Sequence, residues 1–240
     1  MNSQGDGQFE WKVLGESMPG EREPGRNLRL AVLISGSGTN LQAIIDAIED
    51  GKLPNTEIAL VISNNAAAYG IQRALQHKVP VIYLPWRKFP AGAFMHEMTP
   101  NEARIAGLLQ FFRVDLVVLA GWMRIFSPPF LDQFARRVIN IHPGLLPPEG
   151  TGETYRLSNG KTIPVLRGLN AVKKALEAGL NVTGSSVHYV TAEVDAGPVI
   201  CQQEVPIKPD DTEESLHERL KEVEHGLIVE AIRSFYQILP

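Results

Sequence analysis

An alternation of short apolar runs with helical segments between residues 29 and 141 constrains the fold of this chain more than any other feature. The apolar runs are almost continuous, which is typical of strands buried on both faces in a parallel sheet covered by crossover helices. Strands and helices are predicted in turn, beginning with a strand, at 29–35, 41–49, 58–63, 68–77, 79–84, 101–112, 115–120, 129–135 and 138–141. We therefore expect a doubly wound α/β fold, with a mostly parallel, Rossmann-like sheet and helices on both faces.

The second half of the chain has a different pattern. Residues 149–166 are rich in Gly, Thr, Ser and Asn without a repeat, and they predict a long loop of the kind that often forms a lid. After this loop we expect a helix at 169–178, strands at 185–190 and 199–207, and an amphipathic helix at 212–236. Residues 1–27 show no periodicity and predict a disordered tail. Residues 28–240 are expected to form a single domain, because no linker divides them.

Composition excludes several classes of function. The 240 residues carry a net charge of −4 without a stripe of Lys and Arg, which argues against nucleic acid as a partner. No apolar run approaches the ~20 residues that cross a bilayer, and the start lacks a secretory signal. The single cysteine, Cys201, suits a reducing cytoplasm and predicts buried packing. No His, Cys and acidic residues have metal-ligand spacing, so we expect small-molecule substrates, no metal, and a cytoplasmic monomer or homodimer.

Residues 138–147 carry the most informative local motif, because an apolar strand there breaks into a loop where Asn140 and His142 lie two positions apart. Alternation along a strand places both side chains on one face. An amide beside an imidazole suits acyl chemistry, since one group can hold a carbonyl oxygen while the other moves a proton. The alternative is that both side chains cap a turn before Pro143.

A glycine-rich turn, residues 36–40, follows the first predicted strand and precedes a helix. Backbone N–H groups and the helix dipole favour an anion at such a place. The turn lacks the third glycine of a dinucleotide fingerprint and the lysine of a Walker loop, so we interpret it as a seat for one phosphate monoester, held by Gly38, Thr39 and Asn40. The alternative is a tight turn with Thr39 as the helix cap. Because ligands bind at the carboxyl ends of parallel strands, this turn and the Asn140/His142 pair should face one crevice.

Two further segments admit a functional and a structural interpretation. Asp195 lies in a turn, where an aspartate usually bonds its own backbone; if it reached His142 instead, it would raise the pKa of the histidine and make it a general acid near neutrality. His188 is predicted to be a hydrogen-bonded residue of an inner face. Residues 119–126 end another strand, where Arg124 could bind a carboxylate beside a flat ring system, or the apolar side chains could simply pack beneath a loop.

Five segments in this order resemble the phosphoribosylglycinamide formyltransferases: residues 34–44, 119–124, 140–147, 184–190 and 193–200. The resemblance spans about residues 29–236 and implies a formyltransferase catalytic domain with the Rossmann-like formyltransferase fold. The reaction it implies is attack of the amine of 5'-phosphoribosylglycinamide on the formyl carbon of 10-formyltetrahydrofolate, the co-substrate. N-formylglycinamide ribonucleotide and tetrahydrofolate result, in de novo purine (IMP) biosynthesis.

The same resemblance implies roles for individual residues. His142 would donate a proton to the tetrahedral intermediate, Asn140 would hold the formyl oxygen, and Asp195 would raise the pKa of His142 and help, through water, to deprotonate the amine. The ribonucleotide would bind Gly38, Thr39, Asn40 and Glu224. The folate would bind Met123, Arg124, Ile125, Phe126, Asn140, Thr191 and Asp195. The chain departs from the family at Gly144, where relatives often have Ser, and in the long segment 149–166.

Other functions remain as alternatives. A 10-formyltetrahydrofolate hydrolase would share the Asn, His and Asp but would use water, and we expect it to need a regulatory domain for which residues 1–27 are too few. A methionyl-tRNA formyltransferase would need an RNA-binding barrel after residue 207. A binding protein without catalysis would have no need to bring Asn140, His142 and Asp195 together.

Overall fold

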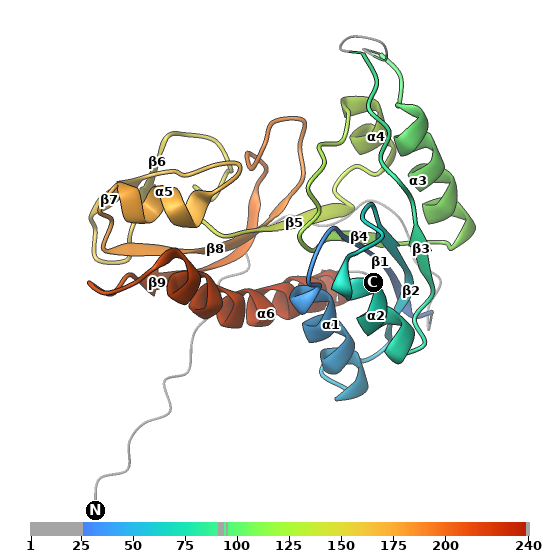
Figure 1. Ribbon diagram of the computed structural model, residues 1–240, viewed down its shortest axis with the longest axis horizontal. Helices are drawn as coiled ribbons and strands as arrows, with labels where there is room; N and C mark the ends of the chain where they lie inside the picture. The colour runs from blue at the N-terminus through green and yellow to red at the C-terminus, as the bar shows by residue number, and fades with distance from the viewer. Residues whose placement is uncertain (1–25, 91–93, 95, 239–240) are drawn as a thin grey trace, which may run out of the picture.

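A seven-stranded sheet runs through the centre of the computed structural model, which describes residues 26–90, 94 and 96–238 (Figure 1). In spatial order the strands are β3 (Val81–Tyr83), β2 (Thr56–Ser63), β1 (Leu28–Ile34), β4 (Leu116–Leu119), β5 (Val138–His142), β8 (Val182–Tyr189) and β9 (Val199–Pro206). The first five strands in this order are parallel to one another, whereas β8 and β9 are antiparallel to their neighbours. The expected doubly wound, mostly parallel sheet is therefore confirmed.

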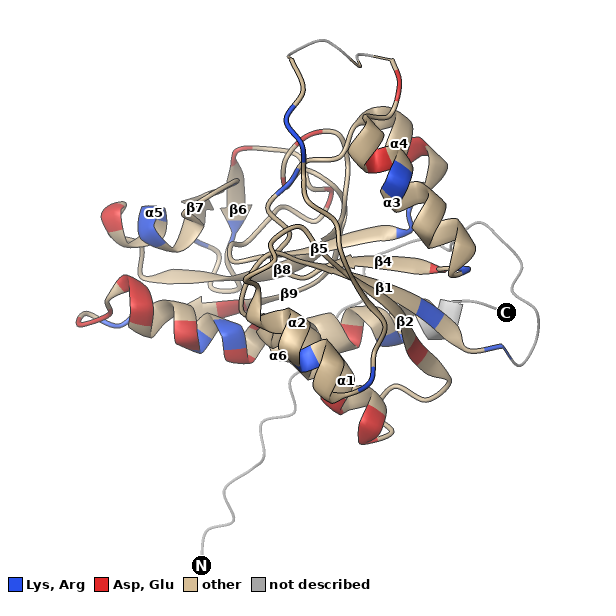
Figure 2. Ribbon diagram, turned by 45° about the vertical axis from the view of Figure 1, so that its right-hand side comes forward, with Lys and Arg blue, Asp and Glu red and all other residues tan. Residues whose placement is uncertain are grey.

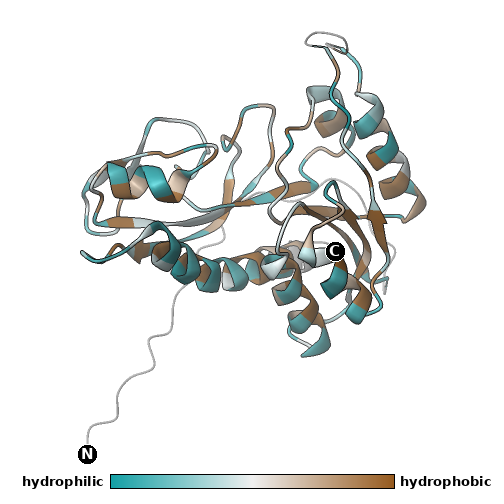
Figure 3. Cartoon of the chain, viewed as in Figure 1, coloured by the Kyte–Doolittle hydropathy of each residue, from teal (hydrophilic) through white to brown (hydrophobic). Residues whose placement is uncertain are grey.

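Helices cover both faces of this sheet, and each face has its own apolar core (Figure 1). One face packs against α1 (Thr39–Glu49), α2 (Tyr69–Gln76) and α6 (Glu213–Ile238). The other face packs against α3 (Pro100–Phe111) and α4 (Pro128–Gln133). The strands of the centre are strongly hydrophobic along their whole length, because both of their faces are buried (Figure 3). The predicted strands and helices of the first half are all present, with ends that differ by a few residues.

The register of the strands brings three chain segments to one edge of the sheet. Leu33 of β1 lies beside Leu119 of β4, and Leu119 lies beside Asn140 of β5, so these strands end at nearly the same level. On the other side of β5, the antiparallel β8 places His188 opposite Asn140 and Ser186 opposite His142. The turn after β1, the loop after β4 and the end of β5 therefore share the rim on which ligands bind in folds of this type.

The segment 149–166, predicted to be a long loop, contains secondary structure of its own. Its two short strands, β6 (Thr154–Arg156) and β7 (Thr162–Pro164), form an antiparallel hairpin (Figure 1). Ser158 in the turn of the hairpin donates two hydrogen bonds to the Glu204 carboxylate of β9, from its backbone N–H at 2.7 Å and from its hydroxyl at 2.9 Å. We call residues 149–168 the arm; it is a structured hairpin fastened to the main sheet and leads into α5 (Ala171–Glu177).

Charged residues of both signs recur along α6 (Figure 2), and two pairs of them form ion pairs one turn apart. Of the predicted tail, only Arg26 and Asn27 lie inside the described residues, where Arg26 pairs with Asp115. Among the described helices, none has the length and apolar character that crossing a membrane requires.

Two glycines fix the turn after β1 against the start of α2. Gly38 has a φ of +69°, and a Cβ atom built on it would lie 2.6 Å from the Cα of Gly70. The N–H of Gly70 donates to the carbonyl oxygen of Gly36 at 3.1 Å. Only a glycine at each position allows the two backbones to approach this closely.

We expect Gly38→Ala to destabilise the chain more than Gly51→Ala does. Gly51 has nearly the same φ, +71°, but a Cβ on it would meet no atom within 4 Å. Gly51→Ala should therefore cost only the left-handed conformation, about 1–2 kcal/mol, and Gly38→Ala about 1–3 kcal/mol more from overpacking. Urea unfolding of the two variants measures the difference. Equal losses would show that the backbones near Gly38 and Gly70 separate without cost.

Candidate active site

The glycine-rich turn ends in an uncapped helix start. Gly38, in the left-handed conformation, is the N-cap of α1, and Thr39 is the first helical residue. The interpretation of Thr39 as the cap is therefore wrong, and no side chain caps this helix. The first N–H groups of an α-helix have no partner within the helix. With no capping side chain, they remain available to an anion, and the helix dipole favours one there.

Asn40, the second residue of α1, joins this turn to α6. Its Nδ2 donates to Oε2 of Glu224 at 3.0 Å, and the hydroxyl of Ser185 contacts the other carboxylate oxygen of Glu224 at 3.5 Å. Asn40 and Glu224 are both buried, and burial raises the pKa of Glu224 above its usual range. The structure thus brings together Asn40 and Glu224, which are 184 positions apart in the sequence.

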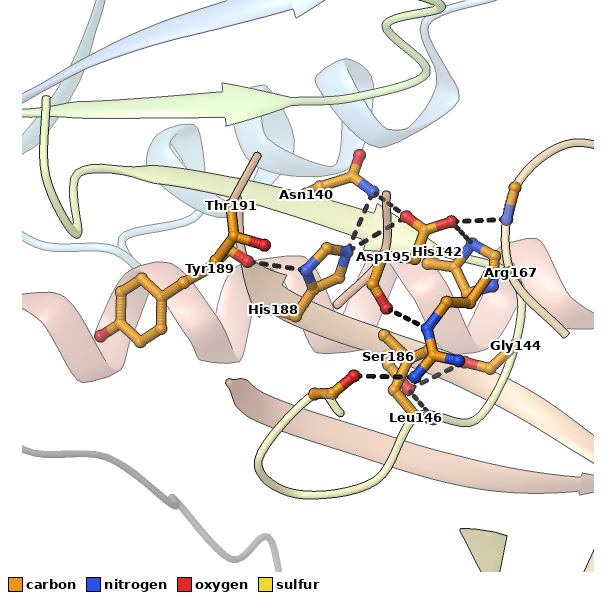
Figure 4. Close-up of polar contacts among 12 residues, drawn as sticks. Asn140, His142, Gly144, Leu146, Arg167, Ser186, His188, Tyr189, Thr191 and Asp195 are labelled. Carbon is orange, nitrogen blue, oxygen red and sulfur yellow. Dashed lines mark hydrogen bonds and ion pairs between the residues drawn. The ribbon is translucent and has the colours of Figure 1, made fainter. Parts of the chain in front are cut away.

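Asn140, His142 and Asp195 meet at the end of β5 (Figure 4). Nδ1 of His142 lies 3.2 Å from Oδ2 of Asp195, and Nδ2 of Asn140 lies 3.4 Å from Oδ1 of the same carboxylate. The His142 and Asp195 side chains are almost completely buried, with exposed fractions of 4% and 9%. The sequence left open whether Asp195 reaches His142, and the structure shows that it does. Asn140 and His142 both contact this carboxylate, so the interpretation that they only cap a turn is not needed.

The second ring nitrogen of His142 faces the arm. Nε2 lies 2.7 Å from the carbonyl oxygen of Leu166, a distance that requires a proton on Nε2, because two acceptors at that separation would repel each other. Nδ1 in turn faces the Asp195 carboxylate at 3.2 Å, so both ring nitrogens face acceptors and only the imidazolium satisfies the two contacts together. Gly144 leaves room for this contact, since a Cβ there would lie 2.6 Å from Nε2 and 3.2 Å from the Leu166 oxygen.

The expected pKa of His142 needs a correction. Burial lowers the pKa of His142 and outweighs the opposing influence of the Asp195 carboxylate and the Leu166 carbonyl, so its pKa lies below 6.5. Asp195 does favour the imidazolium, as expected, but the prediction of a pKa raised toward neutrality omitted the cost of removing a charged ring from water. The Nε2–H of His142 is a hydrogen-bond donor to the Leu166 carbonyl.

Asp195 is held as a carboxylate by its neighbours. Burial alone would raise its pKa, but the hydrogen bond with His188, the interaction with His142 and the backbone N–H of Gly168 together lower the pKa of Asp195 from 3.8 to about 2. The Gly168 N–H donates to Oδ2 at 2.8 Å. Asp195 also has a φ of +50°, which is uncommon for a residue other than glycine and persists only where the surroundings enforce it.

His188 belongs to this cluster, although the sequence indicated only a hydrogen-bonded residue of an inner face. Its Nδ1 donates to the carbonyl oxygen of Tyr189 at 2.8 Å, and its Nε2 lies 3.2 Å from Nδ2 of Asn140. Nε2 also lies 3.4 Å from Oδ1 of Asp195. The amide nitrogen of Asn140 thus faces both His188 and Asp195. To bind the carbonyl oxygen of a substrate, the amide has to give up the longer contact, the one with Asp195. His188 joins the cluster because β8 pairs with β5 and places it opposite Asn140. The sequence does not specify this pairing.

The loop after β4 forms an exposed rim over a buried aromatic stack. The side chains of Met123 and Ile125 are 56% and 67% exposed, and Arg124 is exposed as well. Phe126 is 2% exposed and stacks on Phe130 at 4.1 Å between ring centroids. The prediction that the side chain of Phe126 lines a pocket is therefore not supported, and packing beneath the loop describes it. The loop is tied to β1 by a hydrogen bond from the N–H of Met123 to the Ser35 hydroxyl at 3.2 Å.

The remaining predicted residue, Thr191, lies just after β8, where its hydroxyl donates to the carbonyl oxygen of Glu193 at 3.1 Å. This bond shapes the turn that leads to Asp195. Within the ranges 26–90, 94 and 96–238, no three His, Cys, Asp or Glu residues are grouped so that they could hold a metal ion. Cys201 is buried in β9, as expected, and burial raises the pKa of its thiol to about 12.

A doubly wound sheet whose rim carries a buried Asn–His–Asp cluster beside an uncapped helix start defines a class of enzyme: one that handles a carbonyl group on a substrate with an anionic part. The model of the family described as "Formyl transferase" matches residues 28–232. The chain therefore belongs to the formyl transferase family.

Three relatives illustrate what this chain is similar to. The chain is 42% identical over 208 residues to phosphoribosylglycinamide formyltransferase of Haemophilus influenzae, covering 86% of each protein. It is 38% identical to the trifunctional purine biosynthetic protein adenosine-3 of Gallus gallus, covering 86% of this chain and 18% of that protein. The crystal structure of glycinamide ribonucleotide transformylase 1 from Symbiobacterium toebii superimposes with a TM-score of 0.75 at 41% identity, covering 92% of this chain and 93% of that one.

The pKa of Asp195 makes stability depend on pH. Because the folded pKa is about 2 and the ordinary value 3.8, the carboxylate should contribute about 2 kcal/mol above pH 4, a contribution that is lost as the pH falls toward 2. Asp195→Asn has no such titration, so the gap in unfolding free energy between the wild type and this variant should shrink by about 2 kcal/mol between pH 5 and pH 2. Urea unfolding at a series of pH values measures the gap, with Asp132→Asn on the exposed side of α4 as the control. A gap that stays constant would contradict the assigned ionisation of Asp195.

Proposed function

We propose that this chain is a phosphoribosylglycinamide formyltransferase: it transfers the formyl group of 10-formyltetrahydrofolate to the amine of 5'-phosphoribosylglycinamide. The amine nitrogen forms a bond to the formyl carbon, a tetrahedral intermediate results, and the bond from that carbon to the folate nitrogen breaks, with a proton passing to the folate nitrogen. The products are N-formylglycinamide ribonucleotide and tetrahydrofolate, in purine biosynthesis. The observation that carries the proposal is the meeting of Asn140, His142 and Asp195 on the rim that also holds the turn of Gly38.

His142 and Asn140 are proposed to stabilise the negative charge that develops on the formyl oxygen. The Nε2–H of His142 is the donor, and the oxygen that it meets in the free chain is the Leu166 carbonyl, so the formyl oxygen replaces that carbonyl. In the proposed step His142 acts as an imidazolium whose charge Asp195 stabilises. The developing oxyanion takes the Nε2 proton, and the ring is left neutral with its Nδ1–H bonded to Asp195. A donor of this kind contributes about 10²–10³ in rate. Through a water molecule, Asp195 is also proposed to help remove the proton of the attacking amine.

The phosphate of the ribonucleotide is proposed to bind the N–H groups of Gly38, Thr39 and Asn40 at the start of α1. The left-handed Gly38, its contact with Gly70 and the lack of a capping side chain support this role. Glu224 is proposed to contact the same substrate, since its carboxylate lies against Asn40. Its raised pKa reduces its repulsion of a nearby phosphate.

The folate is proposed to lie along the loop after β4 and the turn that precedes Asp195. The exposed Met123 and Ile125 offer apolar contact to a flat ring system, and Arg124 offers a cation for a carboxylate. Phe126 supports this loop from below, and Thr191 shapes the opposite wall. The reaction needs no metal, because hydrogen bonds and bound-state positioning supply the catalysis. Residues 28–240 are proposed to form one catalytic domain after an extra tail, in the cytoplasm.

The deciding assay follows consumption of 10-formyltetrahydrofolate with and without 5'-phosphoribosylglycinamide. We expect consumption only when the ribonucleotide is present, and we expect His142→Ala to reduce it by about 10³-fold or more, because the donor to the oxyanion is removed. Circular dichroism of the variant checks that the fold is retained. Consumption with water alone would favour the hydrolase, and a His142→Ala variant as fast as the wild type would remove His142 from the chemistry.

Asn40→Ala should weaken binding of the ribonucleotide by about tenfold or more, because it keeps the backbone N–H at the phosphate seat but removes the side-chain partner that holds Glu224 beside it. Binding of the folate should change little, since its proposed walls lie beyond β4 and β8. Calorimetric titration with each substrate separately measures both affinities. Gln42→Ala, later on the same helix, is the matched control. Equal weakening of both substrates would argue against a phosphate seat at α1.

A further inference from the structure

Three consecutive residues at the end of the arm contact the catalytic pair. The carbonyl of Leu166 accepts from His142, and the N–H of Gly168 donates to Oδ2 of Asp195. Between them, Arg167 donates from Nε to the backbone carbonyl oxygen of Asp195 at 3.0 Å (Figure 4). The arm is therefore joined to the site by hydrogen bonds to both members of the pair.

The guanidinium of Arg167 also holds the base of the arm. Its Nη2 donates to the carbonyl oxygens of Gly150 and Gly152, each at 2.8 Å. The backbone at Gly150 already lies against the turn of Asp195, because a Cβ on Gly150 would lie 2.2 Å from the Gly197 oxygen. One planar group thus connects three backbone carbonyls from two chain segments. The side chain of Arg167 is 21% exposed, so most of it is removed from water.

These contacts bear on the unusual backbone of Asp195. A φ of +50° in a residue with a Cβ costs on the order of 1 kcal/mol and must be enforced by the surroundings. The bond from Arg167 to the Asp195 carbonyl restrains the peptide group that follows Asp195, and with it the backbone from which the side chain points toward His142 and His188. A planar fork with donors in fixed directions suits this task, whereas a lysine ammonium can reach these carbonyls only as a single flexible point.

We propose that Arg167 is a positioning residue for the formyl transfer reaction: it holds the turn of Asp195 so that the carboxylate faces His142. Because Arg167 also binds Gly150 and Gly152, it connects this turn to the base of the arm. This inference rests on the proposed function for its effect on catalysis. Arg167 touches neither substrate nor the reacting atoms in this account, and it acts only through Asp195.

The test compares Arg167→Lys, which keeps the charge, with Arg156→Lys on the exposed face of the hairpin as the matched control. In Arg167→Lys, kcat should fall about tenfold or more, because a small misplacement of a catalytic group is costly, while KM for both substrates should stay within about threefold. The pKa of the His142 ring, followed by NMR, should fall below that of the wild type as Asp195 moves away. His188 and Arg167 itself are the other charged or titratable groups that influence His142; this variant leaves His188 unchanged and keeps a positive charge at position 167.

The outcomes separate the possible roles. Wild-type kcat with an unshifted His142 titration would show that Arg167 only fastens the arm and would overturn the proposal, as would a raised KM with unchanged kcat and titration. Arg167→Met, which removes the charge as well, should reduce kcat at least as much as Arg167→Lys. The NMR titration needs no substrate, so it reports on the hold over Asp195 even if the wild type transfers no formyl group, a result that would reject the proposed function instead.

Discussion

The buried carboxylate of Asp195 is the group on which the rest of the site depends. An ionised carboxylate removed from water is strongly unfavourable unless hydrogen bonds and opposite charges replace its hydration. Here the replacements come from three separate parts of the chain: His142 and Asn140 on β5, His188 on β8, and the N–H of Gly168 in the arm. Each of these groups is oriented by contacting the carboxylate, so the charge organises the side chains that surround it.

The change from parallel to antiparallel pairing makes this cluster possible. In a purely parallel sheet, all the carboxyl ends lie at one rim and the returning segments are helices on the faces. Because β8 runs antiparallel to β5, it passes the rim before it ends beside Ile139, near the start of β5, and it places His188 opposite Asn140. The turn that follows β8 folds back and brings Asp195 to His142, while β9 pairs with the outer side of β8 and receives the hairpin through Glu204.

The sequence predicted the fold well because its signals are local. Apolar runs and helical periodicity identify strands and helices wherever burial on both faces leaves a continuous pattern, as in β1 and β4. Asn140 and His142 were predicted as site residues for the same reason, because they lie at the end of the apolar run that forms β5. The hairpin of the arm was missed because its strands are only three residues long, and its stability comes from Ser158 and Arg167, whose partners are distant. The pKa of His142 was predicted in the wrong direction because composition does not reveal how deeply a side chain is buried.

Two buried carboxylates on this rim show how environment, rather than residue type, assigns a role. Asp195 has donors on every side, so its charge is stabilised and its pKa falls to about 2. Glu224 contacts the Asn40 amide and, at 3.5 Å, the Ser185 hydroxyl; these contacts and Lys221 lower its pKa less than burial raises it. In the proposed reaction, an ionised group stabilises the imidazolium of His142, and a carboxyl that readily accepts a proton is better tolerated beside a phosphate. The number of nearby donors therefore distinguishes the two carboxylates: the ionised Asp195 favours a positive charge beside it, whereas the surroundings of Glu224 are more compatible with an anion.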